Sequence, residues 1–196
     1  MRILVVSDKE SRYIWDHFDK SVFSDIGMIL SCGDLSAPYL EFLVTMVNGA
    51  PLFYVPGNHD RGFATAPPEG CVCADGKIVS AGGLRVLGLG GCRSPHRNIY
   101  QHTERDMARR VKRMRRAIKK EGGFDILLTH APAFGLGDGR DLFHRGFECF
   151  VGLLDTYQPK YHFYGHQHKN YSHEKPPESY KNTQLVNAFG YKIIET

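Results

Sequence analysis

The sequence predicts a single α/β domain, and two observations support that prediction. Five short apolar runs, rich in β-branched and aromatic residues, each stop at turn-forming or polar residues; they begin at Ile3, Met28, Leu52, Ile126 and Tyr161. Stretches with helical periodicity separate several of these runs, as expected when strands and helices alternate along a chain. A length of 196 residues suits one domain with a substantial core, so we expect residues 1–196 to form one unit.

Polar side chains follow each of the five apolar runs. In α/β sheets, ligands bind in the crevice beyond the carboxyl ends of the strands, so these side chains should converge. Carboxylates, an amide oxygen and imidazoles without thiolates suit Mn²⁺, Fe or Zn²⁺. Two such ions roughly 3.5–4 Å apart, bridged by a carboxylate, stabilise the attacking and leaving oxygens of an in-line displacement. The converging set comprises Asp8, Asp34, Asn58, His59, His130, His166 and His168.

The remaining elements follow from periodicity and turn residues. Gly82-Gly83 between two apolar stretches predicts a hairpin, and Pro38 suits the first turn of a helix. Thr103 followed by Asp106 resembles a capping box at the start of a long helix. Prolines and glycines without periodicity predict a loop over residues 61–76. We expect helices over residues 11–18, 38–47, 103–120 and 147–157, a loop rich in lysine and proline after His168, and a closing pair of strands at residues 185–186 and 191–194.

The composition is that of an ordinary globular protein. Hydrophobic residues make up 42% and charged residues 23%, and the formal charge of +4 suits an anionic substrate without requiring nucleic acid. Five cysteines and no leader before Ile3 predict reduced thiols in a cytoplasmic protein. Cys71-Val72-Cys73 predicts a loop, because structural zinc takes four ligands with wider pairing. No apolar run approaches membrane-spanning length, so we expect no membrane partner.

Two basic features have both an ordinary and a functional interpretation. The dense arginines and lysines of the helix over residues 103–120 fit a solvated helix face, or contact with nucleic acid. Arg93, after the Gly90-Gly91 exit from an apolar run, fits the surface or a bidentate grip on phosphate. The glycine-rich segment 135–144 follows His130 and should form a loop over the crevice. Arg93 and His144 are therefore candidate substrate-binding residues.

The motifs, taken in order, resemble those of the calcineurin-like metallophosphoesterases. That family has five: Asp-x-His, Gly-Asp, Gly-Asn-His-(Asp/Glu), a single His, and Gly-His-x-His. The resemblance implies a two-sheet β-sandwich flanked by helices, and the segment after His130 is similar to a small bacterial branch. Four motifs are intact here: Gly33-Asp34, Gly57-Asn58-His59-Asp60, His130 and Gly165-His166-Gln167-His168.

The resemblance also implies roles for the motif residues in a centre of two divalent metals. Mn²⁺ is the first choice, with Fe, Zn²⁺ and Mg²⁺ as alternatives. His59 would be the proton donor or a phosphate contact, oriented by Asp60. Asp34 would bridge the metals, with Asp8 and His168 serving the first and Asn58, His130 and His166 the second.

One motif departs from the family pattern. Asp8-Lys9-Glu10 stands where Asp-x-His is expected. The Glu10 carboxylate can replace imidazole at the first metal, and this harder, more anionic donor favours Mn²⁺ or Mg²⁺. The alternatives are an exposed carboxylate at a helix start and a site that has lost one metal and part of its activity.

Together these features predict a metal-dependent phosphoesterase acting on phosphodiesters or small phosphorylated metabolites rather than on phosphoproteins. The alternative is a degenerate metal-binding domain that binds nucleotide or nucleic acid without turnover. The expected partner is a small phosphoester, with nucleic acid as second choice. No feature of the sequence bears on oligomeric state.

Overall fold

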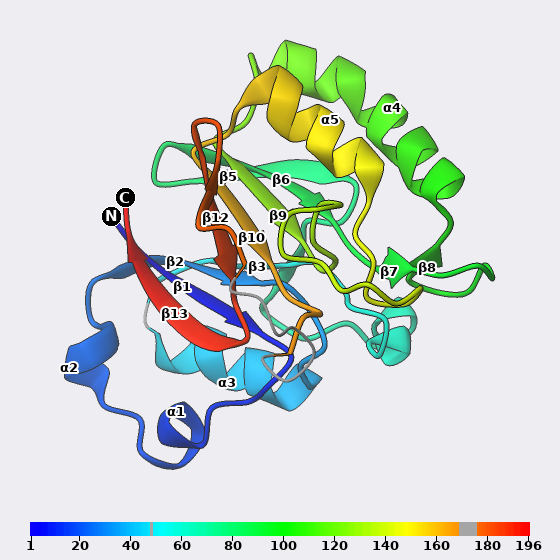
Figure 1. Ribbon diagram of the computed structural model, residues 1–196. Helices are drawn as coiled ribbons and strands as arrows, with labels where there is room; N and C mark the ends of the chain where they lie inside the picture. The colour runs from blue at the N-terminus through cyan, green and yellow to red at the C-terminus, as the bar shows by residue number, and fades with distance from the viewer. Residues whose placement is uncertain (48, 169–175) are drawn as a thin grey trace.

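The computed structural model describes residues 1–47, 49–168 and 176–196. Two β-sheets lie face to face, with helices on both outer sides (Figure 1). Strands β1 to β4 of the first sheet are parallel, and β13 runs antiparallel to β1. The order of this sheet is β13 (Gly190–Glu195), β1 (Arg2–Ser7), β2 (Ile26–Ser31), β3 (Leu52–Tyr54) and β4 (Val72–Cys73).

The second sheet has a parallel centre and two antiparallel edges. Strands β12, β10, β9 and β6 are parallel, whereas β11 and β5 run the opposite way. The antiparallel pairing of β5 with β6 confirms the predicted hairpin. The order is β11 (Ser179–Tyr180), β12 (Thr183–Asn187), β10 (Tyr161–Tyr164), β9 (Ile126–Thr129), β6 (Leu84–Leu89) and β5 (Lys77–Ala81); β7 (Cys92–Arg93) and β8 (Gln101–His102) form a separate two-stranded ribbon.

Three apolar layers hold the sheets and helices together. Between the sheets, Val5 and Leu30 of the first pack in one cluster with Leu128 and Phe163 of the second. A second cluster joins the outer face of the first sheet to α1 (Arg12–Asp16) and α3 (Ala37–Met46). A third joins the outer face of the second sheet to α4 (Glu104–Lys120) and α5 (Glu148–Tyr157). Burying one such aliphatic side chain contributes about 1.5–3 kcal/mol, and the order helix–sheet–sheet–helix confirms the expected sandwich.

Helix boundaries follow local capping chemistry. The Ser36 hydroxyl accepts a hydrogen bond from Tyr39 N at 3.3 Å, so α3 begins where Pro38 predicts. The Thr103 hydroxyl accepts one from Asp106 N at 3.2 Å, which confirms the predicted cap of α4. The helix expected over residues 11–18 ends earlier, at Asp16, and a separate single turn, α2 (Lys20–Phe23), follows it.

Two local predictions were wrong. The strands at residues 185–186 and 191–194 do not pair with each other, because β12 adds to β10 in the second sheet and β13 adds to β1 in the first. Residues 61–76 also hold a 3₁₀ helix, η1 (Arg61–Ala64), and β4, elements too short to produce a periodic pattern. The loop predicted after His168 covers residues 169–175, which lie outside the described residues.

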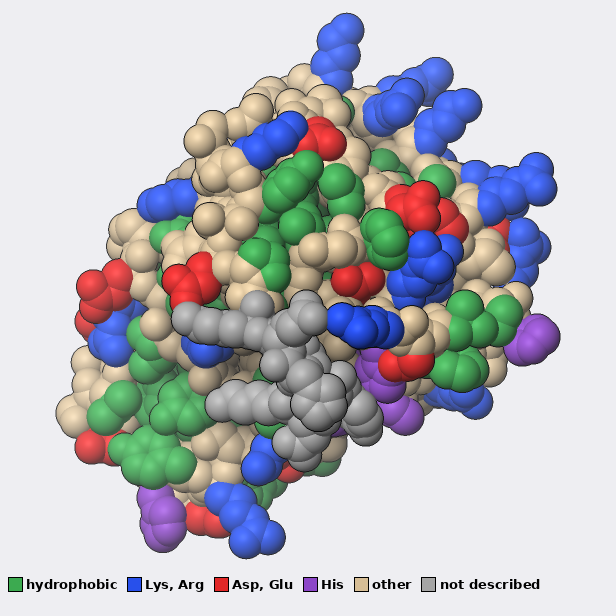
Figure 2. Space-filling view, viewed as in Figure 1, with side chains coloured by type: hydrophobic (Ala, Val, Ile, Leu, Met, Phe, Trp, Pro, Cys, Tyr) green, Lys and Arg blue, Asp and Glu red, His purple; other side chains and the backbone are tan. Residues whose placement is uncertain are grey.

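The surface and the thiols agree with the composition. Basic side chains gather over α4 (Figure 2). All five cysteines are free; Cys71 precedes β4, and Cys73 lies within β4 opposite Tyr54 of β3. Within the described part of the chain, no helix has both the length and the apolar character needed to cross a bilayer.

Candidate metal centre

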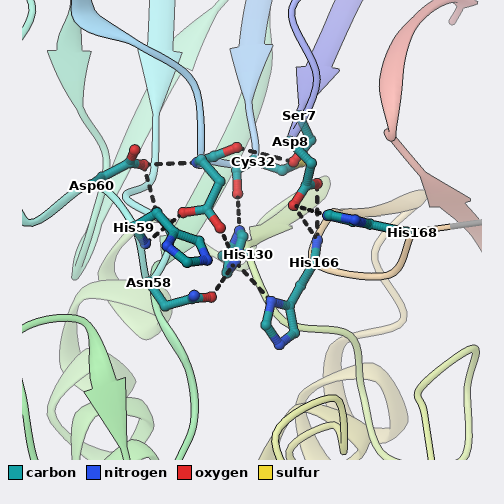
Figure 3. A network of polar contacts seen from close by, with 12 residues as sticks. Ser7, Asp8, Cys32, Asn58, His59, Asp60, His130, His166 and His168 are labelled. Carbon is teal, nitrogen blue, oxygen red and sulfur yellow. Dashed lines mark hydrogen bonds and ion pairs between the residues drawn. The ribbon is translucent and has the colours of Figure 1, made fainter. Parts of the chain in front are cut away.

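The candidate site lies at the carboxyl ends of five parallel strands. Strands β1, β2 and β3 run in one direction in the first sheet, and β9 and β10 are parallel in the second. The residues after these strands meet in one network (Figure 3). The predicted convergence of strand ends is therefore what the structure shows, and it draws on both sheets.

Three of the converging residues have left-handed backbone conformations, with φ of 62° at Asp8, 56° at Asp34 and 64° at His166. Residues other than glycine rarely adopt this conformation, and functional sites hold a large share of the cases. Hydrogen bonds hold two of these turns in place: Asp8 N donates to the Gly33 carbonyl at 3.1 Å, and His166 N donates to the Asp8 carboxylate at 3.0 Å. The strained turns aim the side chains into the crevice.

Asp60 holds two of the loops together. Its Oδ2 accepts hydrogen bonds from Asp34 N at 2.8 Å and from Gly57 N at 2.7 Å. Burial raises the pKa of Asp60 to about 6, against the lowering effect of the two N–H groups. The backbone N–H of His59 donates to Asp34 Oδ1 at 2.8 Å. The described contacts thus place Asp60 on the backbone beside Asp34 rather than on the His59 ring.

Backbone carbonyls fix which nitrogen of each buried histidine faces the centre. His130 Nδ1 lies 2.8 Å from the Cys32 carbonyl, and His166 Nε2 lies 2.8 Å from the Phe143 carbonyl. A carbonyl oxygen only accepts hydrogen bonds, so both of these nitrogens carry protons. In the neutral imidazoles the lone pairs are therefore on His130 Nε2 and His166 Nδ1, the arrangement that orients metal-ligating imidazoles.

Other potential metal-ligand atoms lie close to these two nitrogens. His130 Nε2 lies 3.1 Å from His166 Nδ1, 3.0 Å from Asn58 Oδ1 and 3.3 Å from Asp34 Oδ2. Asp34, His130 and His166 each offer one ligand atom, and these atoms lie within 4.8 Å of one another. A positive charge on or beside His130 Nε2, either a proton or a metal cation, relieves the repulsion among these atoms, and with the metal in place the donor set fits a divalent ion of the Mn²⁺, Fe or Zn²⁺ type.

The pKa values of His130 and His166 are shifted in opposite directions. Burial lowers the pKa of His130, but Asp34 and Asp8 outweigh it and raise that pKa to about 9. Burial, helped by His130, lowers the pKa of His166 to about 3. Burial opposes a low pKa at Asp34, but its hydrogen bond with His130 lowers it. Two adjacent imidazoles with opposite shifts show that the centre favours one added positive charge beside Asp34.

Asp8 and His168 are the two ligands that the motifs predict for the first metal. The Asp8 side chain is 1% exposed, and its Oδ1 lies 3.6 Å from Nε2 of His168, whose side chain is 43% exposed. The His168 ring also packs against Phe189, with ring centroids 4.9 Å apart. The buried Asp8 and the more exposed His168 are therefore neighbours, and Asp8 is joined to the group of Asp34, His130 and His166 through His166 N.

Comparison of the sequence with protein-family models identifies the family of this chain. Residues 1–170 match the model of the calcineurin-like phosphoesterases. The chain belongs to this family. Family membership indicates metal-dependent hydrolysis of phosphoesters as the general activity. Comparison with curated proteins gives no match.

Two solved structures share the calcineurin-like phosphoesterase fold with this chain. One crystal structure superposes with a TM-score of 0.67 at 14% sequence identity, over 98% of this chain and 94% of the other. The crystal structure of TT1561 of Thermus thermophilus superposes with a TM-score of 0.60 at 13% identity, over 96% of this chain and 89% of that one. At such identities the likeness shows the fold alone.

Glu10 occupies the one position that departs from the family motif. Its Oε1 accepts a hydrogen bond from the Ser36 hydroxyl at 2.5 Å, and the residue is exposed. Ser36 caps α3 two residues beyond Asp34, so Glu10 is tied to the loop that carries the proposed bridging ligand. Glu10 is not part of the group formed by Asp34, His130 and His166.

The two predicted substrate-binding residues differ in placement. Arg93 NH1 donates to the Gly146 carbonyl at 3.1 Å and lies 3.6 Å from Glu104 Oε2, so its guanidinium joins β7 to the segment before α5. The His144 ring stacks on the His166 ring, with centroids 5.1 Å apart and an interplanar angle of 29°. His144 thus adjoins the centre, while the Arg93 contacts are structural.

Sequence reasoning missed the groups that orient the histidines. The carbonyls of Cys32 and Phe143 do so, and backbone atoms leave no signature in residue type. Asp141 holds the turn at Phe143, because its Oδ1 accepts the Phe143 N–H at 3.0 Å and its Oδ2 pairs with His144 Nδ1 at 2.8 Å. The only available signal was the polar, glycine-rich character of residues 135–144.

Proposed function

We propose that the chain hydrolyses phosphodiesters or small phosphorylated metabolites through a dinuclear metal centre that works best with Mn²⁺. The observation that carries this proposal is the convergence of His130 Nε2, His166 Nδ1 and Asp34 Oδ2, three ligand atoms within 4.8 Å of one another. Paired metals of this kind activate a water and stabilise the oxygens of an in-line displacement.

Each side chain then has a proposed task. Asp34 is the bridging ligand, because one carboxylate reaches His130 and its loop also adjoins Glu10. His59, beside Asp34, contacts the phosphate or supplies the proton to the leaving oxygen, while Asp60 holds the loop in position. In this proposal Asp8 and His168 serve the first metal, and Asn58, His130 and His166 the second.

Glu10 is proposed as an additional oxygen donor to the first metal. Its Oε1 is bonded to Ser36, which leaves Oε2 for a cation. Because a carboxylate is a harder donor than imidazole, Mn²⁺ should support activity better than Zn²⁺. Glu10→Gln should lower the ratio of the rate with Mn²⁺ to the rate with Zn²⁺. Ser36→Ala is the control, because it removes the hydrogen bond and keeps the carboxylate. An unchanged ratio in Glu10→Gln would show that Glu10 is not a metal ligand.

The activity itself has a direct test. Purified protein supplied with Mn²⁺ should hydrolyse bis-4-nitrophenyl phosphate or 4-nitrophenyl phosphate, and a chelator should abolish the rate. The ratio of the two rates assigns the diester or monoester preference. A protein that binds Mn²⁺ but releases no nitrophenolate from either compound would contradict the proposal. A cytoplasmic location is also proposed, since free thiols suit a reducing compartment.

A second candidate function is binding of nucleic acid without turnover. One observation favours it: Arg109, Lys112, Arg113 and Arg116 line one open groove on α4, at spacings that share a helix face. Among the described residues, only Arg109 of these four has an ion pair, with Asp106 at 3.2 Å. Salt-dependent binding of oligonucleotides, together with no hydrolysis of any phosphoester, would favour this function.

A further inference from the structure

A cavity adjoins the metal centre on the side of Asp8. It has a volume of about 660 Å³ and lies between the turn after β1 and the start of β13. Its walls include Lys9, Glu10 and Arg12 on one side and Phe189 and Tyr191 on the other. We call it the β13 pocket, and its volume is that of a site for a small organic ligand.

The β13 pocket adjoins the candidate metal centre through the chain and through one ring contact. Lys9 follows Asp8 directly in the chain, and the Phe189 ring packs 4.9 Å from the ring of His168. Ser7, the last residue of β1, bridges to Phe189 and pairs with Gly190. A molecule with a phosphoester at the centre therefore has this pocket as a neighbouring place for its remaining part.

The charges of the β13 pocket suit an anion. Neither Lys9 nor Arg12 has an acidic partner in the described part of the chain, and both are exposed. Glu10, the carboxylate that the described residues contribute to the wall, accepts a hydrogen bond from the Ser36 hydroxyl at 2.5 Å. Two exposed cations near the centre attract a second negative group on the same ligand.

The opposite wall suits a planar group. Tyr191 is 37% exposed although it lies within β13, and it lines the pocket. Nucleobases stack on such aromatic rings, and phosphates pair with arginine and lysine. A nucleotide carries both kinds of group, a base and a phosphate, within one small molecule.

We propose that the β13 pocket binds a nucleotide portion of a phosphodiester substrate, with the base on Tyr191 and a second phosphate on Lys9 and Arg12. This inference rests on the proposed function, because it concerns the part of the substrate that does not react. It makes the pocket the feature that selects nucleotide diesters over simple phosphoesters.

Two substrates with the same leaving group test the inference. Thymidine 3′-phosphate 5′-(4-nitrophenyl phosphate) carries the base and the second phosphate, and bis-4-nitrophenyl phosphate carries neither. Tyr191→Ser and Arg12→Ala should each lower kcat/KM for the nucleotide about tenfold, the effect of losing one stacking or phosphate contact. Both variants should keep the wild-type rate with bis-4-nitrophenyl phosphate.

Matched controls separate the pocket from general surface effects. Tyr13→Ser removes another exposed tyrosine, 46% exposed in α1, and Lys20→Ala removes a cation of α2; neither residue lines the pocket. Both control variants should behave as wild type with either substrate. A uniform loss across both substrates, or no loss in Tyr191→Ser and Arg12→Ala, would overturn the inference.

Binding separates failure of this inference from failure of the proposed function. If the wild-type protein hydrolyses neither substrate, calorimetry with thymidine 3′,5′-bisphosphate still tests the pocket. Binding weakened about tenfold by Tyr191→Ser would support the pocket while the hydrolase proposal fails. Equal affinity in wild type and Tyr191→Ser, or no binding to either protein, would overturn the inference.

Discussion

Gly57 precedes the Asn58-His59-Asp60 motif and lies where only a hydrogen atom fits. A Cβ at this position would lie 2.5 Å from Asp34 Cγ and 2.8 Å from Asp34 N, whereas ordinary contacts begin near 3.4 Å. The φ of Gly57 is not in the positive region, so alanine meets no backbone strain there. Gly57→Ala therefore tests the position of Asp34, both its carboxylate and its backbone nitrogen.

The size of the effect follows from these distances. Restoring ordinary contact requires the carboxyl carbon of Asp34 to move by about 1 Å, and a displacement of that size in a reacting group costs on the order of 10²-fold in rate. Asp34 also contacts His130 Nε2 at 3.3 Å, so the same movement should weaken metal binding. We expect kcat/KM to fall about 10²-fold, with lower Mn²⁺ affinity.

The assay is hydrolysis of bis-4-nitrophenyl phosphate over a range of Mn²⁺ concentrations, with bound metal measured by elemental analysis. Gly62→Ala in η1 is the matched control, because a Cβ there meets nothing within 4 Å and its φ is not positive. Gly62→Ala should keep wild-type activity. Wild-type rate and metal content in Gly57→Ala would refute the reasoning, since Asp34 would then not need its observed position.

Three further predictions concern the centre and the core. Asp34→Asn should lower metal content and activity together, because a neutral amide leaves two cations in mutual repulsion; full metal occupancy in this variant would exclude the bridging role. His59→Asn should keep the metals while turnover falls on the order of 10²–10⁴-fold, the effect of a lost acid or base, and a parallel loss of metal would reassign it as a ligand. Burial lowers the pKa of His162 to about 3. The unfolded chain therefore takes up a proton near pH 6.5 that the folded chain refuses, and the free energy of unfolding should fall by roughly 1.4 kcal/mol per pH unit below that point. His162→Leu should flatten this slope in urea melts between pH 4 and 7, and an unchanged slope would place the titration elsewhere.

The geometry around His162 supports the direction of that last effect. The Thr129 hydroxyl donates its proton to the Ala131 carbonyl at 2.6 Å. His162 Nε2 lies 2.9 Å from the Thr129 hydroxyl oxygen, so it is the donor in the contact between His162 and Thr129. His162 Nδ1 is buried and has no hydrogen-bond partner among the described residues. A proton added there would create a buried charge without compensation, which is costly.

The site was more predictable than the sheet to which each strand belongs. Side chains such as Asp8 and His130 directly follow apolar runs, so their convergence needs only the parallel direction of the strands. The division into two sheets depends on which strands pair, and fully buried strands carry no alternation that reports a neighbour. That is why residues 185–186 and 191–194 were expected to pair with each other, although they belong to different sheets.

The finer chemistry of the centre was less predictable, for a different reason. The choice of ligand nitrogen on His130 and His166 depends on two carbonyl groups, and the role of Asp60 depends on two N–H groups. Every residue type but proline supplies both groups, so sequence does not mark them. The contact of Glu10 with Ser36 joins two loops that lie 26 residues apart in the chain, which the spacing of Asp8 and Glu10 does not reveal.

The pairing of β13 with β1 has a consequence for how the protein forms during synthesis. Strands β1 to β4 are complete once residue 73 has left the ribosome, but β1 has no neighbour on one side until residues 190–195 follow. At ordinary translation rates this interval is on the order of ten seconds. An open, apolar strand edge invites pairing with other chains. Nascent chains should therefore need protection by a chaperone at β1, and slow translation between the two strands should increase aggregation.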